Sequence, residues 1–101
     1  VIFAISYSGE SRDVVMQSRQ AKGMAKIIAL TGEPGSPLAE IADVCIDVRS
    51  SETAYRTDAM VSRMVQIVVV DILFTALAIR GGNTTLARLA RARQGLSFLK
   101  F

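Results

Sequence analysis

The stretch Ser6-Tyr7-Ser8-Gly9-Glu10-Ser11 lies between an apolar run, residues 1–5, and a helix-like segment, residues 12–22. Three hydroxyls and one glycine therefore stand where a buried strand would turn into a helix. The N-terminus of a helix carries unpaired N–H groups and about half a positive charge, so this junction suits an anion. The stretch predicts a phosphate-binding loop, which we call the serine loop (residues 6–11).

Helix capping is the alternative for each serine, because a single serine before a helix is more often its N-cap than a ligand. Three hydroxyls together with Gly9, which permits a tight turn or a close ligand, favour a ligand loop. The loop lacks the Gly-Lys-Ser/Thr ending of a P-loop. With one glycine it also lacks the dinucleotide-binding fingerprint.

The apolar run 1–5 is continuous, which predicts a central strand covered on both faces. Further along, the pattern predicts strands at 26–30 and 44–48 and helices at 12–22, 36–42, 57–79 and 86–93. This alternation predicts an α/β fold, a three-layer parallel sheet with flanking helices of flavodoxin-like or Rossmann-like type. Asp43 and Asp47 interrupt the third strand and indicate a position near the sheet edge.

Ligands bind such sheets at the carboxyl ends of the strands. Three loops are expected to meet at that edge: residues 6–11, 31–35 and 49–53. The predicted fold thus brings polar side chains together from three distant parts of the chain.

The chain has 101 residues, half of them hydrophobic, which suits one small core-forming domain. Its first residues are already strand-like, which predicts a partial copy of a domain whose N-terminal elements lie elsewhere in a longer protein. A single cysteine, Cys45, rules out an intrachain disulfide and fits a cytoplasmic location. With no histidine the usual zinc patterns are missing, and no metal or cofactor is predicted.

The charge is divided unevenly along the chain. Residues 1–79 contain seven Lys/Arg and nine Asp/Glu, a net charge of −2, whereas residues 80–101 contain five Lys/Arg and no acid. The body therefore shows no basic excess that would indicate nucleic-acid binding. The basic tail predicts a solvated or partner-facing helix rather than a DNA contact.

The apolar stretch 60–79 is long enough to cross a bilayer. Arg63 and Asp71 lie within it, and each charge at the centre of a span costs a few kcal/mol. A buried helix of a soluble protein is the preferred interpretation, with no membrane association. Because its second half is apolar almost all round, the helix predicts a homo-oligomer interface.

The serine loop resembles the Ser-x-Ser-Gly-x-Thr/Ser signature of the sugar isomerase (SIS) domain. Residues 28–31, 37–39 and 42–43 are similar to the same family. Three later segments resemble one branch of it, the bacterial RpiR/MurR-type transcriptional regulators: residues 52–56, 62–63 and 71–74. The resemblance covers residues 1–80 and implies the C-terminal part of a SIS sugar-phosphate-binding domain, followed by a basic tail, residues 81–101.

The resemblance implies a phosphorylated sugar as ligand. Ser6, Ser8 and Ser11 would bind its phosphate, with help from the backbone of Tyr7 and Gly9. Glu52 matches the acidic residue at the sugar end of the family's site; an ion pair with Arg56, four residues on, is the alternative. The resemblance also implies a helix-turn-helix domain that is absent from this chain. DNA would be bound only through that domain.

Three functions follow as hypotheses. The preferred one is the sugar-phosphate-sensing effector domain of a transcriptional regulator, which is not an enzyme. The second is an aldose–ketose isomerase of the same fold, which needs a base to move a proton; no histidine is present, and Glu52 is the only carboxylate expected in the cleft. The third is a dimerisation module with a vestigial loop.

Overall fold

A parallel sheet of three strands is the centre of the computed structural model, which describes residues 1–50 and 60–99. The strands lie in the order β1-β2-β3 and comprise β1 (Ile2–Ile5), β2 (Ile27–Thr31) and β3 (Val44–Asp47). Ala4 on β1 pairs with Ala29 on β2, which pairs in turn with Cys45 on β3. The predicted α/β class is confirmed, and β3 lies at an edge of the described part of the sheet, as predicted.

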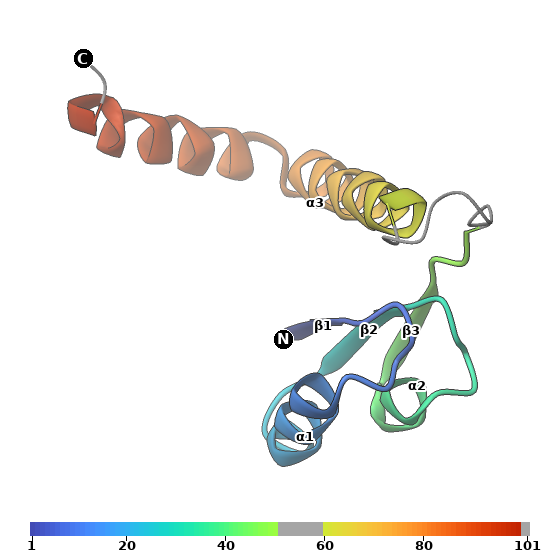
Figure 1. Ribbon diagram of the computed structural model, residues 1–101. Coiled ribbons are helices and arrows are strands. Elements are labelled where there is room, and N and C mark those ends of the chain that lie inside the picture. The colour runs from blue at the N-terminus through green and yellow to red at the C-terminus, as the bar shows by residue number, and fades with distance from the viewer. Residues whose placement is uncertain (51–59, 100–101) are drawn as a thin grey trace. The chain divides into compact units, whose positions relative to one another are not determined.

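Two helices, α1 (Arg12–Ala21) and α2 (Pro37–Ile41), cover one face of this sheet (Figure 1). Right-handed crossovers between neighbouring parallel strands place both helices on the same side. The start of α2 follows the sequence prediction, because Ser36 Oγ accepts a hydrogen bond from the Ala39 N–H at 3.4 Å.

The core lies between the sheet and these helices. Alternate side chains of β1 and β2 point toward α1 and α2, since successive residues of a strand face opposite sides. The buried apolar cluster consists of Ala4, Val15, Ile27, Ala29 and Leu38. β2 is the central strand of the described sheet, because it pairs with β1 on one side and with β3 on the other.

The prediction that residues 1–5 form a central strand stays a prediction, because among the described strands β1 pairs on one side only, with β2. In β1 only Ala4 is buried. Phe3 and Ile5, which point away from α1, are 48% and 43% exposed. A continuous apolar run indicates that both faces of a strand can be covered, but it does not fix the order of strands.

The long helix α3 (Met60–Gly95) consists of two helical stretches that meet at Gly82, where φ is +56° and ψ is −138°. The predicted break at residues 81–83 is therefore confirmed as an interruption. The second stretch runs on to Gly95, beyond the predicted end at residue 93, and a short 3₁₀ helix, η1 (Ser97–Leu99), follows.

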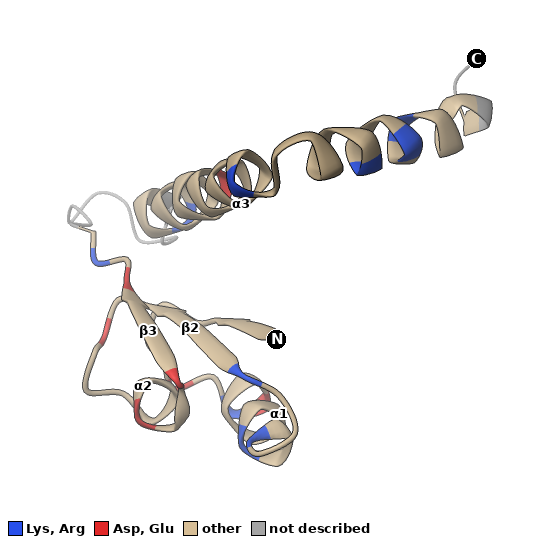
Figure 2. Ribbon diagram, turned by 180° about the vertical axis from the view of Figure 1, so that it is seen from behind, with Lys and Arg blue, Asp and Glu red and all other residues tan. Residues whose placement is uncertain are grey.

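The chain divides into two units, Val1–Ile67 and Val68–Phe101. The predicted division after residue 80 concerns the extent of the sugar-phosphate domain and stays a prediction. In the second unit, the last turns of α3 carry Arg without Asp or Glu (Figure 2). By length and composition alone, α3 could also cross a membrane, although Arg63, Asp71 and Arg80 lie within it.

Candidate phosphate-binding site

The serine loop joins the carboxyl end of β1 to the N-terminus of α1. Ser6 is only 9% exposed, whereas Ser8 and Ser11 lie open to solvent. Gly9 has a positive φ of +67°, a conformation that glycine adopts without steric cost. The loop therefore turns sharply between its second and third serines.

The N-terminus of α1 offers unused hydrogen-bond donors beside these hydroxyls. The first helical hydrogen bond runs from the Val15 N–H to the Ser11 carbonyl at 2.9 Å. The N–H groups of Arg12, Asp13 and Val14 precede it and have no helical acceptor. Together with the helix dipole they attract an anion.

The hydroxyls of the loop divide into one with a local partner and two without. Ser8 Oγ accepts from the Glu10 N–H at 3.2 Å and keeps its own hydrogen for donation. Ser11 is the N-cap residue of α1, but its side chain makes no capping hydrogen bond. Within residues 1–50 and 60–99, neither the Ser11 nor the Ser6 hydroxyl has a hydrogen-bond partner. Capping, the alternative to a ligand role, thus does not occupy Ser11.

The backbone of the loop is tied to its neighbours. The Tyr7 carbonyl accepts two hydrogen bonds, from Thr31 Oγ1 at 3.0 Å and from the Gly32 N–H at 2.8 Å. The Gly9 carbonyl accepts from the Leu38 N–H at 3.1 Å. β2 and α2 therefore hold the loop in one shape before any ligand binds, which lowers the entropy that binding would cost.

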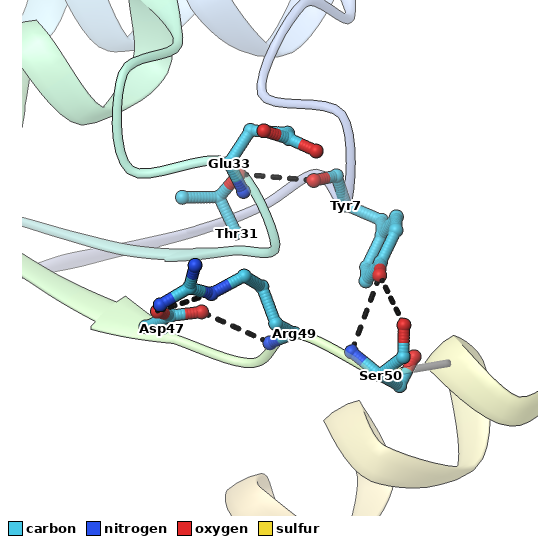
Figure 3. Close-up of polar contacts among 6 residues, drawn as sticks. All are labelled: Tyr7, Thr31, Glu33, Asp47, Arg49 and Ser50. Atoms are coloured by element: carbon cyan, nitrogen blue, oxygen red, sulfur yellow. Dashed lines mark hydrogen bonds and ion pairs between the residues drawn. The ribbon is translucent and has the colours of Figure 1, made fainter. Parts of the chain in front are cut away.

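The Tyr7 side chain reaches a third segment of the chain (Figure 3). Its hydroxyl donates to the Ser50 carbonyl at 2.9 Å and accepts from the Ser50 N–H at 3.2 Å. Its ring lies against Gly32, where any Cβ would collide with the ring carbons. The convergence of three loops is thus confirmed for the described parts of 31–35 and 49–53.

A shallow cavity of about 520 Å³ adjoins the loop. Its lining includes two carboxylates and consists of Tyr7, Ser8, Glu10, Glu33, Gly35 and Ser36. Carboxylates accept hydrogen bonds from sugar hydroxyls but repel an anion. The cavity therefore suits the hydroxyls of a ligand, and the N-terminus of α1 suits its anionic group.

Arg49, in the third of these loops, already has a partner. Its guanidinium bonds Asp47 Oδ2, with the closest nitrogen at 2.7 Å, and its backbone N–H donates to Asp47 Oδ1 at 3.0 Å. The hydrogen bond from the Arg49 backbone is the largest cause that holds the pKa of Asp47 below its ordinary value, and the hydrogen bond from the guanidinium is the next. Residues 6–11 contain no Lys or Arg, so the serine loop itself offers neutral donors and the dipole of α1.

Two further sequence predictions concern groups outside this geometry. Glu52 lies outside the described residues. No cluster of three or more metal-ligating side chains occurs among the residues that the structure describes. Sequence reasoning missed Thr31 and Gly32 as supports of the loop, although a threonine and a glycine at a strand end were visible signals.

Residues 1–76 match the SIS domain family. The chain is 38% identical over 102 residues to an uncharacterized HTH-type transcriptional regulator of Thermotoga maritima, and 40% identical over 101 residues to another of Caldanaerobacter subterraneus subsp. tengcongensis. These alignments cover 100% and 99% of the chain but only 36% of either relative.

Solved structures agree on the fold. The Vibrio vulnificus NanR protein, complexed with ManNAc-6P, superimposes with a TM-score of 0.81 over 97% of this chain and 37% of its own, at 20% identity. At that identity the likeness concerns the fold alone. A hypothetical protein of known structure gives a TM-score of 0.51 at 27% identity, over 73% of this chain and 47% of its own.

Proposed function

The chain belongs to the SIS domain family, and from that premise we propose that it is the sugar-phosphate-sensing effector domain of a bacterial transcriptional regulator. The observation that carries this proposal is the junction of β1 and α1. There, hydroxyls without partners in the described residues stand beside three unused N–H groups at the positive end of a helix. Such a junction holds a phosphate through neutral donors.

The ligand we propose is a phosphorylated sugar. Ser6, Ser8 and Ser11 would bind the phosphate, assisted by the backbone of Tyr7 and Gly9. The cavity beside the loop, with its two carboxylates, would take the sugar hydroxyls, and Glu52 is proposed to contribute at that end. NanR, which shares the fold, was solved with a phosphorylated amino sugar, and this supports the choice of ligand class.

The regulatory output would lie outside this chain. The two curated relatives are named HTH-type regulators, and the chain spans 36% of their length. We propose that a helix-turn-helix domain in the remaining part of such a protein binds DNA in the cytoplasm. A ligand would change operator affinity only to the extent that it binds two states of the protein differently.

Isothermal titration calorimetry of the chain with a panel of hexose 6-phosphates and N-acetylhexosamine 6-phosphates tests the proposal. At least one compound should bind and remain chemically unchanged after long incubation. Conversion of an aldose phosphate to a ketose phosphate would favour the isomerase hypothesis instead. A folded chain that binds none of these compounds would favour a vestigial loop.

Replacing Ser8 by alanine should weaken binding of the best ligand by about 1–3 kcal/mol, since a charged phosphate oxygen loses a hydrogen-bond donor. Ser6→Ala should weaken binding by a similar amount, since Ser6 supplies a hydroxyl on the buried side of the loop. Ser97→Ala, in η1, is a matched control that should leave the affinity unchanged. Unchanged affinity in both loop variants would contradict the phosphate assignment.

We further propose that α3 forms a homo-oligomer interface. Its first stretch exposes apolar side chains that a soluble protein would cover with a partner: Ile67, Val68, Ile72, Phe74 and Leu77. Phe74→Asp should therefore shift the chain from dimer to monomer in sedimentation at equal concentration, and Phe74→Leu should not. A monomeric wild-type chain would contradict the interface, and a need for detergent to keep it dissolved would favour a membrane helix.

A further inference from the structure

Three groups of Tyr7 are held by two parts of the chain, residues 31–32 and Ser50. Its carbonyl accepts from the end of β2, at Thr31 Oγ1 and the Gly32 N–H. Its ring lies against the backbone at Gly32. Its hydroxyl makes two hydrogen bonds to the Ser50 backbone, 43 residues away in the sequence.

The position of Tyr7 in the serine loop makes these contacts consequential. Ser6 and Ser8 are its chain neighbours, so a shift of its backbone moves both hydroxyls that are proposed to bind phosphate. The same shift would carry the phenol away from Ser50. The loop and the Ser50 backbone are therefore mechanically linked through one side chain (Figure 3).

We propose that Tyr7 is a positioning residue that couples phosphate occupancy of the serine loop to the backbone of Ser50. The inference rests on the proposed function, because it needs an anion in the loop. Coupling of this kind is reciprocal: the Ser50 hydrogen bonds stabilise the loop shape that binds phosphate, and bound phosphate stabilises the Ser50 hydrogen bonds. Tyr7 thus carries ligand information from the serine loop to the Ser50 backbone.

Amide hydrogen exchange at Ser50 measures this coupling directly, because that N–H donates to the Tyr7 hydroxyl. The probes are glucose 6-phosphate, N-acetylmannosamine 6-phosphate and inorganic phosphate, each at saturation. The reference is the Asp43 amide, which donates to the Ile27 carbonyl at 2.9 Å at the opposite end of the sheet and reports overall stability. A bound probe should slow exchange at Ser50 at least about 3-fold more than at Asp43.

Tyr7→Phe keeps the ring against Gly32 and removes only the hydroxyl. In this variant the excess slowing at Ser50 should vanish, and affinity should fall about 3- to 10-fold, as expected for one or two neutral hydrogen bonds. Ser50→Ala is the matched control, because both bonds to Tyr7 come from the Ser50 backbone. It should keep both the excess slowing and the affinity of the wild type.

If Tyr7 had only a structural role, Tyr7→Phe would lower the stability of the fold and speed amide exchange at Ser50 and Asp43 equally. If a probe binds and the wild type shows no excess at Ser50, or if Tyr7→Phe keeps the excess, the coupling is overturned while the proposed function stands. If no probe binds the wild type, both fail together. Calorimetry on the same samples separates these outcomes.

Discussion

Gly9→Ala is expected to lower the free energy of unfolding by about 2–4 kcal/mol and to weaken sugar-phosphate binding at least about tenfold. Two costs add at this position. The positive φ of +67° disfavours any residue with a Cβ by about 1–2 kcal/mol. The new methyl group would also collide with the Ser36 side chain and lie 3.0 Å from Thr31 Oγ1. The loop must move, and its hydroxyls move with it.

Alanine variants at two other glycines separate the backbone cost of a positive φ from the steric cost of the new methyl group. Gly23 also has a positive φ, of +91°, but a Cβ there meets nothing within 4 Å, so Gly23→Ala should show the backbone cost alone. Gly35 lines the same cavity as the serine loop and carries neither cost, so Gly35→Ala should be close to neutral. Urea denaturation of the three variants gives the comparison.

The double variant Gly9→Ala/Ser36→Gly tests the collision itself. It removes the side chain that the new methyl group meets, and glycine is tolerated at an N-cap at a cost of only a few tenths of a kcal/mol. Part of the lost stability should therefore return, as a favourable coupling in a double-mutant cycle. A Gly9→Ala variant as stable as Gly35→Ala would contradict the close packing of the loop.

Much of the arrangement around Gly9 was predictable from the sequence. Apolar runs and the Ser36-Pro37 pair predicted the strands and the start of α2, since strand burial and helix capping are local properties. The meeting of loops at one edge followed from the parallel sheet alone. The helix interruption followed from the pair of glycines at 81 and 82.

Other features depend on long-range geometry that a single sequence does not encode locally. The bonds between Tyr7 and Ser50 join residues 43 apart and exist only because β1 and β3 end at the same edge. The absence of a capping bond from Ser11 depends on a backbone angle, with ψ at 112°. Roles for individual serines, and for Glu52, remain predictions.

The second large effect concerns the ligand. A sugar without its phosphate should bind at least about 100-fold more weakly than the sugar phosphate, a difference of about 3 kcal/mol, because charge-assisted hydrogen bonds contribute about 1.5–3 kcal/mol each. Equal binding of the free sugar would show that the serine loop is not where the ligand is held. Paired titrations with glucose and glucose 6-phosphate measure this difference.

The pH dependence of the affinity shows whether an ionisation of the ligand or of the protein controls binding. The chain has no histidine, the side chain that ordinarily titrates between pH 5 and 8, and Asp47 stays ionised there because its pKa lies below the ordinary value. A sugar phosphate gains its second negative charge near pH 6. Its affinity should therefore rise as pH increases from 5 to 7, since the dianion offers more charge to the helix N-terminus. The matching sugar sulfate stays a monoanion over this range, so its affinity should be flat; a parallel rise for both ligands would place the titrating group on the protein instead.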